Sequence, residues 1–174
     1  MVQIREIEEK DIPEVLRLIK DSYAPYKEFI DGVGIPGYSY EEISSLAAES
    51  HSDVWIAEEK GEITGMAAGT EFGPCAYHLK MLFVGGESQH KGVGGELLER
   101  FEARGKERRH SLYTANYLDW AKWSGVFYEK HGYKEYVRGD EKNCPELKAQ
   151  IDFLKEIGKL NNGDKHFIWK RSLE

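Results

Sequence analysis

The chain has 174 residues, 40% of them hydrophobic and 32% charged, so it can bury a core without disulfides or a structural metal. Its formal net charge of −7 argues against nucleic acid or an anionic membrane as the main partner, because both require a basic surface. Cys75 and Cys144 lack metal-ligand spacing, and no metal site is expected. Without an export-type N-terminus or a long apolar run, the sequence predicts a cytoplasmic protein.

The first forty residues predict a strand, an amphipathic helix and a loop. Residues 2–7 alternate apolar and polar side chains, as a half-buried strand does. Residues 11–23 change to a helical period, and Asp11 followed three residues later by Glu14 resembles a capping box. Residues 23–40 are rich in Gly, Pro and Tyr and keep no period, so we expect a short helical turn and a loop there.

The middle of the chain predicts a second helix and three strands. The helix is expected at residues 40–50, and residues 53–72 predict a hairpin that turns at Lys60-Gly61. Residues 75–84, "CAYHLKMLFV", form a longer apolar strand that leads into a cluster of glycines.

The remaining residues predict three helices and three strands. The first is a helix with Leu97, Leu98 and Phe101 on one face, followed by a strand at 110–117. A helix at 120–133 that ends at Gly132 and a strand at 134–138 come next. The last two are a helix at 144–160 with Leu147, Ile151, Leu154 and Ile157 on one face and a strand at 165–172. Because strands and helices do not alternate strictly, we expect one α/β domain over residues 1–174 with a mixed sheet.

The glycine cluster lies between the apolar strand and the next helix, in "LFVGGESQHKGVGGELL". It has neither the GxxxxGK[ST] nor the GxGxxG order of nucleotide-binding loops. Glycines at such a turn let successive backbone N–H groups converge where the helix macrodipole favours negative charge. A pyrophosphate fits this arrangement, and Lys91 could add positive charge. A plain glycine-rich turn is the alternative that the spacing leaves open.

This segment resembles motif A of the GCN5-related N-acetyltransferase (GNAT) superfamily, an apolar strand followed by Q/R-x-x-G-x-G/A and a helix. Gln89, Gly92 and Gly94 occupy the signature positions. "GVFYEKHGY", residues 125–133, resembles the "FYEKxGF" segment of the family, and residues 53–69 resemble its second and third strands. The order of elements agrees from residue 2 to about 138 and again in the last strand.

The resemblance implies a GNAT-like acyl-CoA N-acyltransferase fold of the α/β (α+β) class. A twisted mixed sheet of about seven strands is flanked by helices, and its fourth and fifth strands separate around the pantetheine arm of acetyl-CoA. Departing from the family pattern, an extra helix lies between the last two strands, as an insertion at about residues 143–162.

The activity implied by the resemblance is N-acetyl transfer. The acetyl group moves directly from the acetyl-CoA thioester to a primary amine of a small molecule or peptide in a ternary complex, and coenzyme A is released. A non-catalytic acyl-CoA-binding regulatory module is the alternative, and a structural or interaction domain without a ligand is a third.

Two side chains are the candidates for proton transfer. Tyr128 matches the general-acid position of the family, and a tyrosine with a pKa of about 10 stays protonated at neutral pH. His78 aligns with a position where some family members carry a base, and a pKa of about 6.5 suits a histidine to that role. Glu71 is a second candidate base, and catalysis without a single base is a third interpretation. A tyrosine packed in the core or a histidine bonded within the sheet is the structural alternative in each case.

The resemblance also implies cofactor contacts along the strand end, the loop and the later helix. The expected residues are Leu82, Phe83, Val84, Gln89, His90, Lys91, Gly92, Val93, Gly94, Gly95, Ser124 and Tyr128, with a backbone N–H near Leu82 or Phe83 for the oxyanion. Two positions depart from the family pattern. Gly86 stands where many members have Pro, and Ser124 or Asn116 would replace an Asn of the later helix.

The acceptor is expected at the segment between the first two helices. Tyr26, Phe29 and Tyr38 could form an aromatic-walled pocket for an amine, or some of these rings could belong to the core. The extra helix, taken as residues 145–159, could cover the acceptor channel or pair with a second subunit as a homodimer contact.

Overall fold

The computed structural model describes residues 2–30, 37–160 and 165–172, and only the backbone of Phe29 and Ile30. The chain divides into two compact units. Unit 1 consists of Met1–Gly69 and Met81–Phe101, and unit 2 consists of Thr70–Lys80 and Glu102–Glu174. The prediction of a single domain over residues 1–174 stays a prediction.

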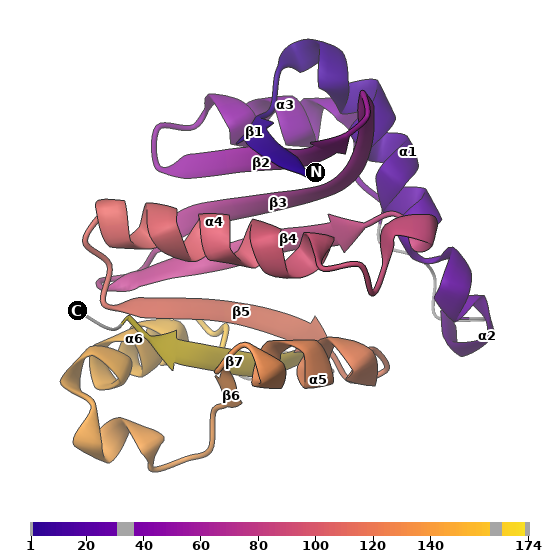
Figure 1. Ribbon diagram of the computed structural model, residues 1–174. Helices are drawn as coiled ribbons and strands as arrows, with labels where there is room; N and C mark the ends of the chain where they lie inside the picture. The colour runs from indigo at the N-terminus through magenta and orange to yellow at the C-terminus, as the bar shows by residue number, and fades with distance from the viewer. Residues whose placement is uncertain (1, 31–36, 161–164, 173–174) are drawn as a thin grey trace. The chain divides into compact units, whose positions relative to one another are not determined.

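Unit 1 contains the N-terminal elements and the glycine turn (Figure 1). In chain order its elements are β1 (Gln3–Glu6), a 3-10 turn (Glu9–Asp11), α1 (Ile12–Ser22), a 3-10 turn (Ala24–Tyr26), α2 (Lys27–Ile30), α3 (Tyr40–Ala48), β2 (Ser52–Glu59), the first part of β3 (Glu62–Phe72), the end of β4 (Ala76–Val84), a 3-10 turn (Gly86–Ser88) and the start of α4 (Val93–Glu107).

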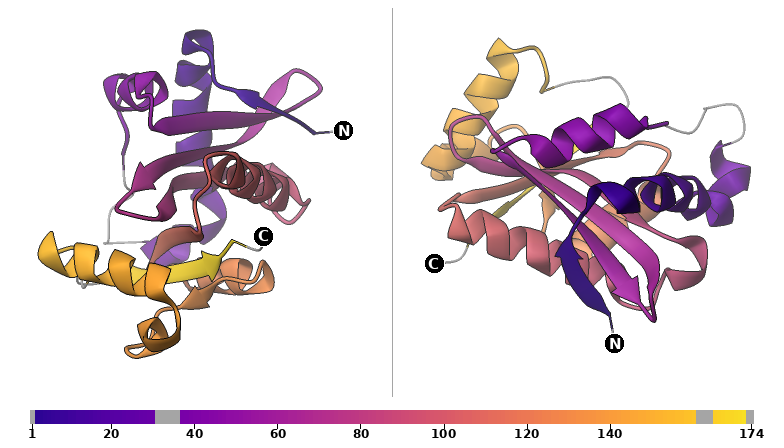
Figure 2. Two further views of the ribbon diagram at one scale, coloured as in Figure 1. Left: turned by 90° about the vertical axis from the view of Figure 1, so that its left-hand side faces the viewer. Right: turned by 90° about the horizontal axis from the view of Figure 1, so that it is seen from above.

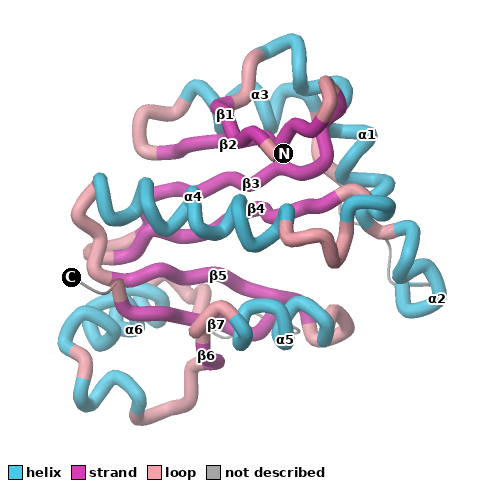
Figure 3. The backbone as a smooth tube through the Cα atoms, in the orientation of Figure 1, coloured by secondary structure: helices cyan, strands magenta, loops and turns pink. Residues whose placement is uncertain are grey.

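Unit 2 contains the rest of β3, β4 and α4 and the C-terminal elements. These elements are β5 (Leu112–Leu118), α5 (Lys122–Lys130), β6 (Lys134–Glu135), a 3-10 turn (Asp140–Asn143), α6 (Pro145–Glu156) and β7 (Lys165–Arg171). Strand pairing among the described residues gives one seven-stranded mixed sheet in the order β1-β2-β3-β4-β5-β7-β6 (Figure 3). The predicted α/β class, the mixed sheet and the extra helix between the last two strands are confirmed.

Helices cover both faces of the strands of unit 1. Val54 and Ile56 of β2 belong to a core cluster with the buried sides of α1 and α3, which lie over these strands in the right-hand view of Figure 2. Trp55 lies between them in sequence and therefore faces the opposite side of the sheet. That face is covered by α4, because a Cβ placed on Gly65 of β3 would come within 2.9 Å of Leu97. Close packing of α4 is the reason for a glycine inside this strand.

The predicted capping box of Asp11 and Glu14 is wrong. The Asp11 carboxylate accepts hydrogen bonds from the Glu8 backbone N–H (2.8 Å) and the Arg5 guanidinium (2.7 Å), so it closes the turn before α1. Hydrogen bonding to Arg5 lowers the pKa of Asp11. Glu14 instead accepts from the backbone N–H of Ile63 at 3.2 Å and ties α1 to β3. The partners of Asp11 lie three and six residues before it, on the side away from Glu14. Glu14 binds a residue 49 positions away, and sequence spacing cannot show such a partner.

Two local predictions in unit 1 are confirmed. The hairpin turns at Lys60 and Gly61, whose φ angles of 55° and 84° are the left-handed pair of a type I′ turn. The second helix begins at Tyr40 as expected and ends at Ala48, and Ser39 and Glu42 cap it reciprocally, at 3.1 and 2.6 Å. Part of the predicted loop, residues 31–36, lies outside the described residues.

In unit 2, α6 is packed against the sheet by its apolar face. Leu147, Ile151 and Leu154 are buried in a cluster that includes Phe167 and Trp169 of β7. The left-hand view of Figure 2 shows α6 beside this strand. This face is therefore filled by its own unit and is not a free surface for a homodimer. Ile157, predicted on the same face, follows the last helical residue and is 40% exposed.

The strand β5 pairs with two neighbours of opposite direction. It runs parallel to β4 over Ala76–Leu79, which lie opposite Leu112–Ala115, and antiparallel to β7 over its full length. The final strand before α6 is shorter than predicted, since β6 consists only of Lys134 and Glu135. Gly132 has a φ of 85° directly after α5, as expected for the residue that ends a helix.

Candidate functional site

The glycine turn of unit 1 connects β4 to α4. The chain leaves β4 through a bond from the Gly85 N–H to the Thr64 carbonyl (3.0 Å) and passes through left-handed conformations at His90 and Gly92, with φ of 62° and 93°. A Cβ on Gly92 would meet nothing within 4 Å. The glycine is therefore needed here for its backbone angle and not for space.

The start of α4 supplies backbone donors at this turn. The Glu96 N–H donates to the Gly92 carbonyl at 3.1 Å. The N–H groups of Val93, Gly94 and Gly95 precede that bond, and the first turn of a helix offers them no intrahelical acceptor. His90, Lys91 and Gly92 are exposed beside them. These donors, the positive end of the helix dipole and the charge of Lys91 are the features that an anion site needs. The predicted anion site itself stays a prediction.

The side chain of Gln89 is directed into the protein. Its Nε2 donates to the carbonyls of Ser22 (2.8 Å) and Val84 (3.1 Å), so the loop is fixed to the end of α1 and to the end of β4. A second hydrogen bond to α1 runs from the Gly86 N–H to Oδ2 of Asp21 at 2.9 Å. Sequence reasoning missed Asp21, because nothing in the helical pattern of α1 singles out an exposed residue in its last turn.

Aromatic rings join the predicted cofactor strand to the predicted acceptor segment within unit 1. Phe83 of β4 lies 5.9 Å from both Tyr23 and Tyr38, and its contact with Tyr38 is edge-to-face. Burial raises the pKa of Tyr23 to about 12, so this phenol stays protonated. Leu82 and Val84 are half-buried on either side of Phe83.

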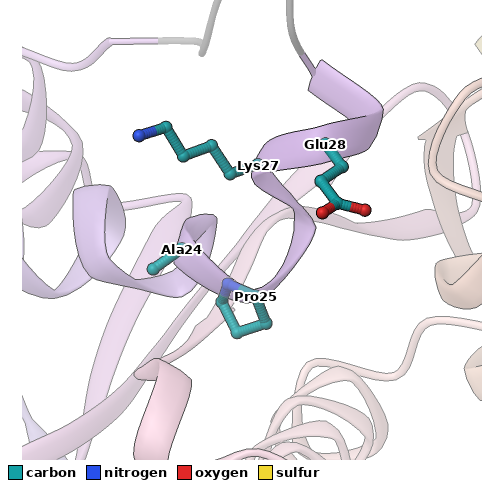
Figure 4. Close-up of a pocket in the computed structure, with 4 residues that line it drawn as sticks. All are labelled: Ala24, Pro25, Lys27 and Glu28. Carbon is teal, nitrogen blue, oxygen red and sulfur yellow. The ribbon is translucent and has the colours of Figure 1, made fainter.

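The other two predicted acceptor residues lie in the segment after α1. Tyr26 is half-buried, and burial raises its pKa. The side chain of Phe29 lies outside the described residues. A hollow of about 390 Å³ is lined here by Ala24, Pro25, Lys27 and Glu28 (Figure 4). Figure 4 shows the Lys27 and Glu28 side chains extending in different directions, and the two carry opposite charges.

In unit 2, Tyr128 is buried on α5. It is 7% exposed, and its ring contacts Phe127 at 5.2 Å and Tyr133 at 5.6 Å, both edge-to-face. Burial raises the pKa of Tyr128 above its ordinary value, so the hydroxyl remains protonated throughout the neutral range. The packing and the protonation state fit either a core tyrosine or a proton donor.

His78 lies in β4 opposite Thr114 of β5. Its Nδ1 is 3.0 Å from Oγ1 of Thr114, and its ring is 5.5 Å from the ring of Phe72. Burial, assisted by Lys80, Lys159 and Lys165, lowers the pKa of His78 to about 4. The imidazole is therefore neutral at pH 7 and is a weaker base than an exposed histidine.

The two predicted proton-transfer residues belong to opposite faces of the sheet of unit 2. His78 shares its face with α6, since Phe72, which contacts the His78 ring, also contacts Phe153 of that helix. The helix α5, which bears Tyr128, packs on the other face, because a Cβ on Gly125 would come within 3.0 Å of the Tyr117 ring.

The remaining candidates of unit 2 have protein partners or lie elsewhere on its surface. Glu71, the second candidate base, accepts a hydrogen bond from Arg108 at 2.8 Å. Ser124 is half-buried on α5, and Asn116 is exposed on β5.

The described residues contain no group of three or more His, Cys, Asp or Glu arranged to hold a metal ion. Within residues 2–30, 37–160 and 165–172, no helix is long and apolar enough to cross a membrane.

The seven-stranded mixed sheet and the glycine turn from β4 into α4 define an acyl-CoA N-acyltransferase fold of the GNAT type. A family model described as an acetyltransferase (GNAT) domain matches residues 50–135. The chain therefore carries a GNAT acetyltransferase domain over these residues. It is an N-acetyltransferase, and acetyl-CoA is the cosubstrate of this family.

Solved structures agree with this assignment at the level of the fold. A GNAT acetyltransferase from Staphylococcus aureus Mu50 has a TM-score of 0.75 and 18% identity, over 99% of this chain and 100% of that one. The ribosomal-protein-S18-alanine N-acetyltransferase of Escherichia coli has a TM-score of 0.71 and 14% identity, over 100% and 96%. The PaiA N-acetyltransferase of Thermoplasma acidophilum, solved with coenzyme A, has a TM-score of 0.69 and 16% identity, over 98% and 99%. A search of curated proteins found no match.

Proposed function

We propose that the protein transfers the acetyl group of acetyl-CoA directly to a primary amine of a small molecule or peptide within a ternary complex. One observation carries the proposal. In a chain with a GNAT acetyltransferase domain, the turn from β4 to α4 has left-handed backbone at His90 and Gly92 and unpaired donors at the start of the helix. That arrangement suits a pyrophosphate, which is the most strongly charged group of coenzyme A.

For the cofactor, we propose that residues 89–95 bind the pyrophosphate mainly through backbone N–H groups. The exposed side chain of Lys91 would contribute positive charge. A backbone N–H at Leu82 or Phe83 would donate to the thioester oxygen, where negative charge develops during attack by the amine. Val84 and Ser124 complete the proposed contacts.

For the proton of the leaving group, we propose Tyr128 as the general acid. The amine attacks the thioester carbonyl carbon, the C–S bond breaks, and the Tyr128 hydroxyl donates its proton to the thiolate sulfur. The attacking nitrogen, which is positively charged after the attack, releases one proton to solvent, and solvent returns a proton to the phenolate. The raised pKa of Tyr128 supports the role, because the hydroxyl is always protonated at neutral pH. The same shift makes the phenol a weaker acid.

For the proton of the acceptor ammonium, we propose His78, acting through water. Its pKa of about 4 keeps the imidazole in the proton-accepting form at neutral pH, at the expense of basicity. Bulk water is the alternative acceptor. A His78→Gln variant separates the two, because unchanged kcat/KM from pH 6 to 9 would remove His78 from the mechanism.

For the acceptor, we propose an amine that contacts aromatic surface at Tyr26, Phe29 and Tyr38. The contact between Tyr38 and Phe83 supports this, since Phe83 belongs to the strand proposed to meet the thioester. The net charge of −7 favours a cationic acceptor over an anionic one.

The test is release of free thiol from acetyl-CoA across a panel of polyamines, aromatic amines, amino acids, aminoglycosides and peptides. We expect at least one class to give amine-dependent thiol release. Micromolar-range binding of acetyl-CoA by calorimetry, with no thiol release on any amine, would instead support the regulatory acyl-CoA-binding module. Absence of binding would exclude both.

Compartment and assembly belong to the same proposal. Cys75 and Cys144 are free thiols, which supports a reducing, cytoplasmic location. A homodimer remains a proposal, and its contact would have to lie away from the buried face of α6. Light scattering at several protein concentrations tests it.

A further inference from the structure

The glycine turn is held to the end of α1 by two hydrogen bonds within unit 1. The Asp21 carboxylate accepts from the Gly86 N–H at 2.9 Å, and the Gln89 carboxamide donates to the Ser22 carbonyl at 2.8 Å. Both bonds join segments more than sixty residues apart in sequence. Asp21 and Ser22 directly precede the segment that contains Tyr26.

The turn also fits closely against that junction. A Cβ on Gly85 would lie 3.2 Å from Leu18 and 3.5 Å from Oδ2 of Asp21, and a Cβ on Gly86 would lie 3.4 Å from Pro25. An added Cβ at Gly85 would therefore press on Leu18 of α1, whereas at Gly86 it would make ordinary contact with Asp21 and Pro25.

The Gln89 amide nitrogen makes two hydrogen bonds within the protein. Both of its donor contacts are to backbone carbonyls, of Ser22 and Val84. The Oε1 of Gln89 is buried and has no hydrogen-bond partner among the described residues. A buried, unpartnered acceptor is tolerated only where the other contacts of the group outweigh its cost, so the two donor contacts hold this side chain in place.

We propose that Asp21 and Gln89 are positioning residues for the acetyl-CoA loop, and that through them occupancy of the loop is coupled to the acceptor segment Ala24–Ile30. The inference rests on the proposed function of the loop. Asp21 fixes where the turn begins, and Gln89 fixes the loop at the residue before its left-handed backbone. A cofactor that orders the loop thereby also orders the carbonyl of Ser22 and the residues that follow it.

The first experiment measures the Kd of coenzyme A by calorimetry for wild type, Asp21→Ala and Asp21→Asn. Loss of a charged acceptor for a backbone N–H should weaken binding about tenfold in Asp21→Ala. Asparagine keeps an acceptor oxygen and should restore affinity to within about threefold of wild type. Asp140→Ala is the matched control, because Asp140 is an aspartate of unit 2 that also accepts a backbone N–H, from Val137 at 3.1 Å.

The second experiment follows amide hydrogen exchange of residues 22–30 with and without coenzyme A. In wild type, the cofactor should slow exchange in this segment. In Gln89→Leu, exchange should be faster overall, and the slowing by the cofactor should be lost even at saturating coenzyme A. A purely structural role would change exchange equally in the free and bound states.

The outcomes separate the two proposals. If wild-type protein does not bind coenzyme A, the proposed function of the loop fails. If it binds, but Asp21→Ala behaves like Asp140→Ala or coenzyme A leaves residues 22–30 unchanged, the positioning role fails while the proposed function stands.

Discussion

At the scale of single residues, the open question is whether Tyr128 is a general acid or a core tyrosine. Its position in "FYEK" predicted a general acid, and the structure places it in a packed aromatic group with Phe127 and Tyr133. Such packing holds the ring in one orientation, which a proton donor needs, but a core tyrosine is packed in the same way. A core tyrosine acts through its ring, whereas a general acid also needs the hydroxyl proton.

Tyr128→Phe removes that hydroxyl and keeps the ring. We expect kcat in the thiol-release assay to fall about 100-fold, within the range for loss of a general acid, while the Kd of acetyl-CoA stays within about twofold. Tyr133→Phe is the control, since it removes another buried hydroxyl from the same group and should leave kcat nearly unchanged. Equal turnover in Tyr128→Phe and wild type would contradict the assigned role.

At the scale of elements, the turn from β4 to α4 and the helix α6 differ in how much of each could be predicted from the sequence. The turn was predicted from local glycine spacing, and the structure has a turn there between β4 and α4, with left-handed backbone at His90 and Gly92. The apolar face of α6 was predicted equally well, but what covers it could not be. A helical period identifies a face that must be buried, and its neighbour is chosen by the tertiary fold.

Gly92→Ala tests the turn, because alanine in a left-handed conformation costs about 1–2 kcal/mol even where space is open. We expect the Kd of coenzyme A to rise about tenfold as the loop shifts to relieve this strain. Gly61→Ala introduces the same strain in the β2–β3 hairpin, where φ is also positive and space is also open. Both variants should unfold at slightly lower temperature, but only Gly92→Ala should lose affinity. Equal affinities would indicate that the turn does not bind the cofactor.

Leu147→Ala tests the packing of α6. Leu147 is fully buried in the cluster with β7, so its truncation should lower the free energy of unfolding by about 2–5 kcal/mol. Ile157→Ala, at a 40% exposed position just beyond the helix, should cost less than about 1 kcal/mol. Urea unfolding measures both. A dimer that dissociates in Leu147→Ala without loss of stability would show that the face is intermolecular after all.

At the scale of the whole molecule, two histidines of unit 2 make stability depend on pH in opposite senses. His78 is neutral in the folded state, with a pKa of about 4. His166 lies between Glu135 (2.6 Å) and Asp119 (2.9 Å), and hydrogen bonds to these carboxylates raise its pKa. Folding therefore releases a proton from one histidine and favours a proton on the other.

The sign of each contribution follows from linkage, with an unfolded-state pKa of about 6.5. The contribution of His78 is complete above pH 6.5 and is lost as the pH falls towards 4. That of His166 is complete below pH 6.5 and is lost as the pH rises through its folded-state pKa. Urea midpoints from pH 4 to 9 should thus fall less steeply on the acid side in His78→Gln and less steeply on the alkaline side in His166→Gln. Curves parallel to wild type would refute both assignments.

The sequence by itself determined the elements and the turn, because period, caps and glycine spacing act over a few residues. It predicted the hairpin at Lys60-Gly61, the end of α5 at Gly132 and the glycine turn between β4 and α4. Only the tertiary structure decided the partners. Asp11 closes a turn with Glu8 and Arg5 instead of capping α1, and Asp21 and Gln89 fasten the loop to α1. The bonds of Asp21 and Gln89 join segments more than sixty residues apart, and folding alone brings such segments together. The bonds of Asp11 are local, but the helical pattern could not show that its carboxylate turns back to Glu8 and Arg5.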